Sequence, residues 1–161
     1  MNDGNARIHG TDIRNAEVES LLTFVLADQT FGISVEIVSE IIDPQKTTRV
    51  PCADALAPTL INVRGSIVPV IDLRHRLGMK PGEGRHTSRM LVLDQMLDGK
   101  PAKLAVMADE VKDVIDVTVN EIAQVPQLGI EWPAECFRGV AKLGEALVIL
   151  VNAENAFAIA A

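Results

Sequence analysis

The segment TLINVRGSIVPVIDLR, residues 59–74, indicates most directly how this chain folds. It contains two apolar runs rich in β-branched residues, Leu60–Val63 and Ile67–Leu73, which are separated by Arg64-Gly65-Ser66. β-Branched residues favour strands, and a glycine between two such runs supplies the positive φ of a tight turn. The segment therefore predicts a β-hairpin. Pro69 marks an edge position or a bulge, because proline cannot donate a ladder hydrogen bond.

Arg64 stands at the end of the first of these runs. A guanidinium in that position needs water, a carboxylate or a partner protein. One interpretation is an exposed turn arginine, and the other is an arginine that serves an intermolecular contact. The hairpin alone does not decide between them.

With 161 residues, the chain is long enough for one domain or for two small units that share a core. Hydrophobic residues make up 48% and aromatic residues 3%, so the core must consist mainly of Val, Ile, Leu and Ala. The formal net charge of −7 argues against nucleic acid or an anionic membrane surface as a partner. No run reaches the roughly 18 apolar residues that a spanning helix requires, so we expect no membrane insertion.

The first 19 residues are polar, and they lack the apolar centre of a signal peptide. We expect a flexible arm over residues 1–19, followed by a single domain over residues 20–161. We also expect the protein to be cytoplasmic. Cys52 and Cys136 have no CxxC spacing and are expected to stay reduced in that compartment.

Short apolar runs separated by turn residues continue on both sides of the central hairpin, and they predict about ten strands with little helix. The clearest further strands are Leu21–Ala27, Phe31–Val35, Arg89–Leu93, Ala102–Ala108, Phe137–Leu143 and Ala146–Asn152, followed by a terminal helix over Glu154–Ala161. The pattern is typical of small β-barrels.

A weak internal repeat relates the two halves of the chain. Val50-Pro51 recurs as Val125-Pro126, at an offset of 125 − 50 = 75 positions. Arg64-Gly65 recurs as Arg138-Gly139, at an offset of 138 − 64 = 74 positions. A duplicated β unit predicts two barrels, each marginal alone, that pack together and leave a groove between them.

The residue inventory argues against an enzyme. His9, His75 and His86 have no metal-ligand spacing with one another or with a cysteine, and we find no phosphate-binding glycine loop or nucleophile elbow. A cysteine hydrolase that pairs Cys52 or Cys136 with His75 is the enzymatic alternative, which cysteine-to-serine variants would test. We expect no catalytic residues, no metal and no cofactor.

Several segments together resemble the CheW family of bacterial chemotaxis coupling proteins, over about residues 21 to 157. They are FVLADQTFGISVEIVSEI at 24–41, Arg49-Val50-Pro51, INVRGSIVPVIDLRHRLG at 61–78, ADEVKDVIDV at 108–117 and FRGVAKLGEALVILVN at 137–152. The resemblance implies an all-β fold of two intertwined SH3-like five-stranded β-barrels. Short helices are expected between strands and at the C-terminus.

The resemblance also implies a non-enzymatic adaptor. Proteins of this family bridge the cytoplasmic tip helices of chemoreceptors to the regulatory domain of a CheA-type histidine kinase, in membrane-associated arrays. One alternative is a scaffold that self-associates in array rings, or serves an auxiliary pathway such as pili or surface sensing, without activating a kinase. A CheV-type protein that responds to phosphorylation is another, although the chain has no receiver segment.

The resemblance implies two sets of site residues. The receptor groove pairs a carboxylate with an arginine beside an apolar floor, and its matching residues are Val38, Glu40, Ile41, Val63, Arg64 and Gly65. Ordinary core packing is the alternative for each apolar residue of this set. Kinase binding is expected on exposed strand ends, at Asp109, Val111, Phe137 and Gly139.

Three positions depart from the family pattern. Asp54 stands where proline is usual, Thr59 where glycine is usual, and Val63 where leucine is usual. Because threonine adopts positive φ only at a cost, we expect a rebuilt turn at Thr59.

Overall fold

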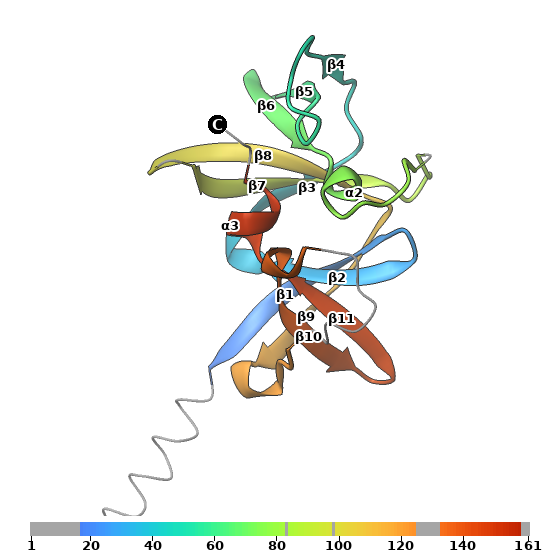
Figure 1. Ribbon diagram of the computed structural model, residues 1–161, viewed down its shortest axis with the longest axis vertical. Helices are drawn as coiled ribbons and strands as arrows, with labels where there is room; N and C mark the ends of the chain where they lie inside the picture. Colours follow the sequence, from blue (N-terminus) through green and yellow to red (C-terminus); the bar gives the residue numbers. More distant parts are fainter. Residues whose placement is uncertain (1–16, 83, 98, 125–132, 159–161) are drawn as a thin grey trace, which may run out of the picture.

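The computed structural model describes residues 17–82, 84–97, 99–124 and 133–158 (Figure 1). Most of this part is strand. The strands are β1 (Val18–Leu26), β2 (Gln29–Ser34), β3 (Val38–Ile42), β4 (Thr48–Arg49), β5 (Thr59–Val63), β6 (Ser66–Ile71), β7 (Arg89–Leu97), β8 (Lys100–Ala108), β9 (Glu110–Thr118), β10 (Phe137–Leu143) and β11 (Ala146–Val151). The helical turns are η1 (Val35–Ile37), α2 (Leu73–Arg76), η2 (Val119–Glu121), η3 (Ala134–Cys136) and α3 (Ala153–Ala156). None of the described helices is long and apolar enough to cross a membrane.

The strands form two sheets, which we call barrel 1 and barrel 2. Barrel 1 has the strand order β10-β11-β2-β1-β9, and barrel 2 has the order β3-β7-β8-β6-β5-β4. Each barrel takes strands from both halves of the chain, since the N-terminal hairpin β1–β2 lies beside the C-terminal hairpin β10–β11 (Figure 1). The predicted all-β fold of two intertwined barrels is therefore confirmed, and the two-residue β4 accounts for the sixth strand of barrel 2.

The central hairpin is present as predicted. Val63 pairs with Ser66, and the two residues between them, Arg64 and Gly65, have φ of +50° and +86°. Two positive φ values in a two-residue loop define the tight turn that matches the twist of the strands. The Gly65 N–H donates a hydrogen bond to the Asn62 side chain at 2.7 Å, which stabilises the turn. Pro69 lies where β6 has not yet reached β8, because that ladder includes only Val70 and Ile71, so the edge prediction is confirmed.

The first hairpin uses the same kind of turn, one position earlier than the sequence suggests. Ala27 and Asp28 have φ of +51° and +66°, and Gln29 already pairs with Leu26. Non-glycine residues seldom adopt this conformation, so the turn must be held by contacts elsewhere. One such contact is the hydrogen bond from the Ala27 N–H to Asp109.

The internal repeat exists, but its offset differs from the predicted 74. Arg64-Gly65 forms a hairpin tip, whereas Arg138 and Gly139 lie inside β10 at a register shift, so the two dipeptides are not equivalent. The helix caps Asp72 and Asn152 are equivalent instead, at 152 − 72 = 80 positions, and each accepts a hydrogen bond from the N–H three residues later. Residues 125 and 126 of the second Val-Pro pair lie outside the described residues.

The departures from the family pattern are accommodated locally. Thr59 lies within β5, paired with Val70 and Arg49, so the rebuilt turn expected at this residue does not occur. The Asp54 side chain accepts a hydrogen bond from the Leu56 N–H at 2.8 Å and so makes its own turn where proline is usual. The terminal helix is shorter than predicted, because α3 ends at Ala156 and Phe157 is fully buried.

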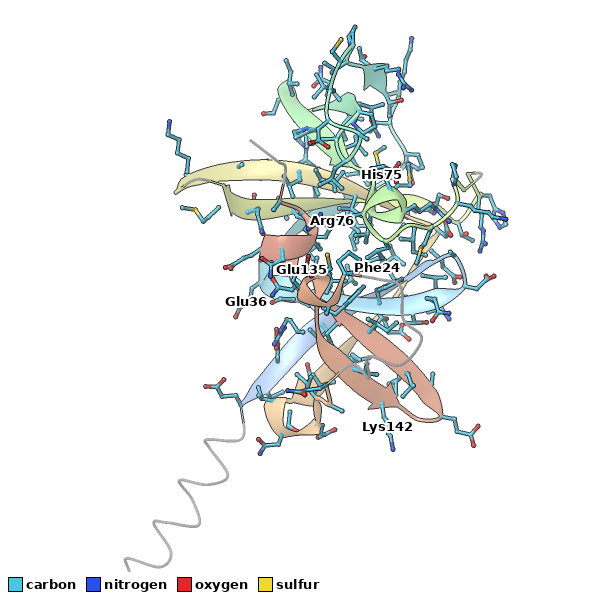
Figure 2. All side chains as sticks on the ribbon, in the orientation of Figure 1. Phe24, Glu36, His75, Arg76, Glu135 and Lys142 are labelled. Atoms are coloured by element: carbon cyan, nitrogen blue, oxygen red, sulfur yellow. The ribbon has the colours of Figure 1, made fainter. Side chains whose placement is uncertain are left out.

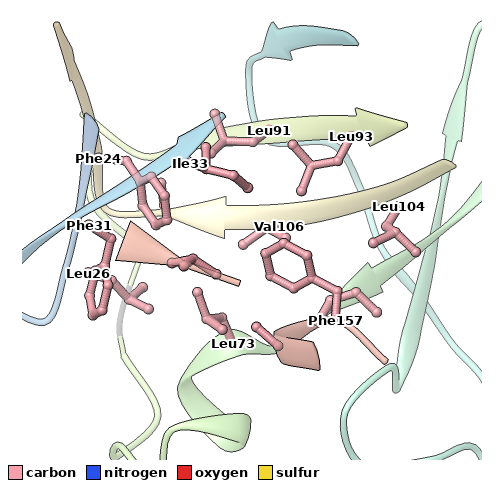
Figure 3. Close-up of a cluster of buried hydrophobic side chains, with 14 of the residues drawn as sticks. Phe24, Leu26, Phe31, Ile33, Leu73, Leu91, Leu93, Leu104, Val106 and Phe157 are labelled. Carbon is pink, nitrogen blue, oxygen red and sulfur yellow. The ribbon is translucent and has the colours of Figure 1, made fainter. Parts of the chain in front are cut away.

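Three apolar clusters of described residues hold the fold together. The largest lies between the barrels, and it combines Phe24 and Ile33 of barrel 1 with Leu93 and Leu104 of barrel 2 (Figure 3). A smaller cluster fills each barrel: Leu21, Val117, Ala141 and Leu150 in barrel 1, and Ile61, Val68, Val70, Met90 and Ala105 in barrel 2. Neighbouring residues of one strand serve different clusters, which explains why the strands are apolar on both faces.

Because the largest cluster is shared, we expect a cavity in it to destabilise both barrels at once. Leu104 is fully buried there, so Leu104→Ala should lower the free energy of unfolding by about 2–5 kcal/mol. Hydrogen exchange should accelerate together in β5 and β10. An acceleration confined to barrel 2 would show that the barrels unfold independently.

Candidate functional site

The carboxylate and the arginine that the resemblance assigns to the receptor groove are in contact. Arg64 Nη1 donates a hydrogen bond to Glu40 Oε2 at 2.6 Å. Glu40 belongs to β3, at one end of the barrel 2 sheet, and Arg64 to the tip of the β5–β6 hairpin near the other end. The ion pair therefore joins strands that the backbone ladder leaves apart.

The exposure of the pair indicates what it can do. The Arg64 side chain is 80% exposed and the Glu40 side chain is 20% exposed. An ion pair of this exposure contributes about 0–1 kcal/mol to stability. The guanidinium carries five N–H donors, so a partner can bind Arg64 while Glu40 orients it.

The three residues of the expected apolar floor do not form a single surface. Val38 packs against the cluster between the barrels, and Val63 packs against the cluster inside barrel 2. Ile41 is 45% exposed. Val38 and Ile41 both belong to β3, and the pairing of β3 with β7 shifts register between Val38 and Glu40. Core packing thus accounts for Val38 and Val63, while Ile41 offers free apolar surface; their part in receptor binding stays a prediction.

A groove between the β7–β8 hairpin and α3 lies beside this strand. Its volume is about 510 Å³, and Ile37, which precedes Val38, lines it. The other lining residues are Asp94, Gln95, Met96, Pro101, Ala102, Lys103 and Glu154. Met96 is 61% exposed, which makes it a candidate apolar anchor that the sequence analysis missed. Its only sequence signal is a large apolar residue next to a turn.

Barrel 1 carries an arginine–glutamate pair of its own. Arg138 donates to both Glu19 oxygens at 2.6 Å, from β10 to β1 across two intervening strands. The Glu19 carboxylate and its hydrogen bonds raise the pKa of Arg138 further above its usual range. The pair borders a second cleft of about 670 Å³, which Val18, Glu36 and Val119 also line. The sequence analysis treated Arg138 only as part of the repeat.

The four residues expected at kinase-binding strand ends are less accessible than predicted. Asp109 and Gly139 are buried, and a Cβ at Gly139 would collide with Ile122 and the Ala123 carbonyl. Val111 is half-buried, and the Phe137 ring stacks on Phe31 at a centroid distance of 6.4 Å. Burial means that Asp109 and Gly139 would act through the surface around them. The assignment of the four to kinase binding stays a prediction.

Asp109 is 3% exposed, and its contacts are intramolecular. Its carboxylate binds Arg74 and accepts a hydrogen bond from the Ala27 N–H at 2.9 Å. Burial acts to raise the pKa of Asp109, but these hydrogen bonds and the charges of Arg74 and Arg85 outweigh it and hold the pKa below its usual range.

No group of three potential metal ligands occurs within the described ranges. The free cysteines also lie in different surroundings, since Cys52 is exposed and Cys136 is buried. Burial raises the pKa of the Cys136 thiol, against the opposing influence of Arg76. A raised pKa disfavours the thiolate, which is the nucleophilic form.

The lowered pKa of Asp109 predicts how its contribution to stability depends on pH. A carboxyl that binds protons less readily in the folded state stabilises it above the unfolded pKa, and the stabilisation is lost as pH falls through the folded pKa. We expect the stability difference between wild type and Asp109→Asn to be large at neutral pH and to shrink progressively below about pH 4. Urea unfolding across this range would measure it. A difference independent of pH would contradict the stated ion pairing.

Comparisons with known proteins agree with the resemblance described in the sequence analysis. A family model described as a CheW-like domain matches residues 20–160. "Chemotaxis protein CheW" of Treponema pallidum is 28% identical over 143 residues, which cover 89% of this chain and 84% of that protein. "Probable chemotaxis protein CheW" of Rhizobium etli is 31% identical over 137 residues, which cover 85% of this chain and 86% of that protein.

A solved structure shares the fold. The crystal structure of the scaffolding protein TtCheW from Thermoanaerobacter tengcongensis matches with a TM-score of 0.74 at 26% identity. The match covers 84% of this chain and 85% of that chain. The similarity therefore extends over both barrels.

Proposed function

Because this chain belongs to the CheW family, we propose that it is a non-enzymatic adaptor that couples chemoreceptors to a CheA-type histidine kinase. The observation that carries the proposal is the Arg64–Glu40 pair at the exposed hairpin tip of barrel 2. An exposed arginine held by a carboxylate adds little stability, so a role in recognition is its better explanation. The adaptor would act in the cytoplasm, at membrane-associated receptor arrays.

Receptor tips are helical, and a helix binds a groove through apolar anchors on one face. Two exposed apolar side chains of barrel 2 are candidates for such contacts: Ile41, next to Glu40 on β3, and Met96, which lines the groove near the end of β7. Polar groups border this groove, among them Asp94, Lys103 and Glu154. In this arrangement the apolar contacts supply most of the affinity, while Arg64 fixes the register of the helix.

Kinase binding would use surfaces on the outer faces of the hairpins. Ile67 in β6 is 75% exposed and Leu147 in β11 is 57% exposed. They occupy equivalent positions of the two barrels, at 147 − 67 = 80 positions. A kinase regulatory domain of similar fold could therefore pair with either barrel through the same kind of contact, an aliphatic side chain on a hairpin face.

The same repetition favours a second candidate function. A chain with two equivalent apolar surfaces can bind copies of itself as well as a kinase, and contacts of this kind generate rings when the rotation closes. The alternative is thus an array-forming scaffold that binds receptors without activating a kinase, in a chemotactic or auxiliary pathway.

We expect Arg64→Ala to weaken the binding of a receptor tip fragment by about tenfold or more, as removal of an interface arginine commonly does. Kinase affinity should stay nearly unchanged, because the variant leaves the exposed aliphatic side chains of Ile67 and Leu147 in place. The melting temperature should also stay within a few degrees, because the ion pair is exposed. Binding of both partners by calorimetry, together with thermal unfolding, would measure the three effects.

Arg89→Ala is the matched control. Arg89 lies on the same sheet, forms an ion pair with Asp43 at 3.4 Å and also donates to the His86 and Ser88 carbonyls, so its removal costs at least as many contacts as that of Arg64. It should leave both affinities unchanged. Equal losses of receptor and kinase binding in Arg64→Ala, or a collapse of its melting transition, would argue that Arg64 is structural.

A further inference from the structure

The chain passes from barrel 2 to barrel 1 through one residue, Asp109. It stands between β8, which belongs to barrel 2, and β9, which belongs to barrel 1. An aspartate at a buried crossover is costly unless its charge is paired and hydrogen-bonded. The partners that pair with this buried charge therefore indicate its structural role.

The partners of Asp109 come from both barrels. Its Oδ2 accepts hydrogen bonds from Arg74 of α2, which follows barrel 2 strand β6, and from the Ala27 N–H in the β1–β2 turn of barrel 1. Its backbone N–H donates to the Val25 carbonyl at 2.8 Å, and its carbonyl accepts from Thr87 Oγ1 at 2.7 Å. A single carboxylate oxygen is thus shared between the two barrels.

The surroundings of this contact leave it little freedom. The side chain of Arg74 is 16% exposed and that of Asp109 is 5% exposed. A Cβ at Gly82 would overlap the Arg74 guanidinium, so the chain at Gly82 lies directly against it. Arg85 adds a cation 3.9 Å from Asp109 and 3.7 Å from Asp28, which extends the charged contacts to the tip of the barrel 1 hairpin.

We propose that the Arg74–Asp109 pair, together with the Ala27 N–H, is a clamp that fixes the orientation of one barrel relative to the other. The apolar cluster between the barrels is adhesive but not directional, since aliphatic side chains can repack after a small rotation. Charge-assisted hydrogen bonds are directional, and a rotation would break either the Arg74 or the Ala27 contact. The clamp does not rest on the proposed function, because all its contacts lie within the chain.

A second contact between the barrels supports the same geometry. Arg76 reaches from α2 toward α3 (Figure 2), and its Nη2 donates to the Asn155 carbonyl at 3.1 Å. Its Nε is buried and has no hydrogen-bond partner among the described residues. One hydrogen bond to a carbonyl is weaker than the buried pair, so the clamp carries the larger share of the orientation.

The test measures the distance between the barrels directly. Spin labels at Ser66→Cys in barrel 2 and Lys142→Cys in barrel 1 occupy exposed positions, and Lys142 points outward at the far end of barrel 1 (Figure 2). The background carries Cys52→Ser, and the buried Cys136 stays unlabelled. We expect one narrow distance distribution in this background, and a distribution at least about twofold broader when Asp109→Asn is added.

Asp94→Asn is the matched control, because Asp94 pairs with Lys103 at 2.7 Å within one hairpin of barrel 2. It should leave the distribution unchanged. A distribution in Asp109→Asn as narrow as in the background would overturn the clamp, and so would equal broadening in both variants.

Hydrogen exchange in the wild-type protein decides the question even when Asp109→Asn does not fold. The Ala27 and Gly65 amides both lie in hairpin turns and both donate to a side-chain oxygen, at 2.9 and 2.7 Å. Only the Ala27 amide belongs to the clamp. It should exchange at least about 100-fold more slowly than the Gly65 amide, and similar rates would overturn the proposal.

Discussion

Burial of the two sheets against each other is the constraint on which the rest of the structure depends. A barrel of about 65 residues is only marginally stable alone, and the clusters inside each barrel are accordingly small. The cluster between the barrels is larger, and it requires strands that are apolar on both faces. The intertwined strand order serves this need. Barrel 1 combines the N-terminal and C-terminal hairpins, and residues of both barrels pack in the shared cluster.

Three ion pairs connect parts of the structure that the backbone ladders do not join. Arg64–Glu40 and Arg138–Glu19 each join strands that the ladders leave apart, one pair in each barrel. Asp109 joins the barrels to each other at their crossover. The Arg64–Glu40 pair is exposed, so Arg64 is accessible to a partner in the proposed recognition role. The Arg74–Asp109 pair is buried, so it serves the fold alone. Exposure, rather than residue type, therefore separates the proposed recognition residue from the structural ones.

The sequence predicts best what is encoded locally. The hairpin around Arg64-Gly65 and the strand bounds Phe137–Leu143 follow from β-branched runs and turn residues, and both are confirmed. The predicted repeat offset of 74 is wrong, because Arg-Gly forms a turn at residues 64–65 and part of a strand at residues 138–139. The split of Val38 from Glu40 depends on a register shift that leaves no mark in the alternation of residues.

Long-range contacts limit the prediction of the site in the same way. The residues of the Arg64–Glu40 contact are 24 positions apart, so local sequence patterns do not predict it. Only the family resemblance led us to expect it. Asp109 resembles a surface aspartate until Arg74, 35 positions earlier, is placed beside it. Burial of a charged residue depends on such a partner, and the sequence around Asp109 does not contain it.

The coupling function is tested most directly by reconstitution of the purified chain with its co-encoded histidine kinase and a receptor fragment. Kinase autophosphorylation would be measured with each component left out in turn. The account predicts a large stimulation that requires all three components and is reduced by Arg64→Ala. Kinase binding without stimulation would indicate the scaffold function instead, and no binding to the kinase would contradict the coupling role.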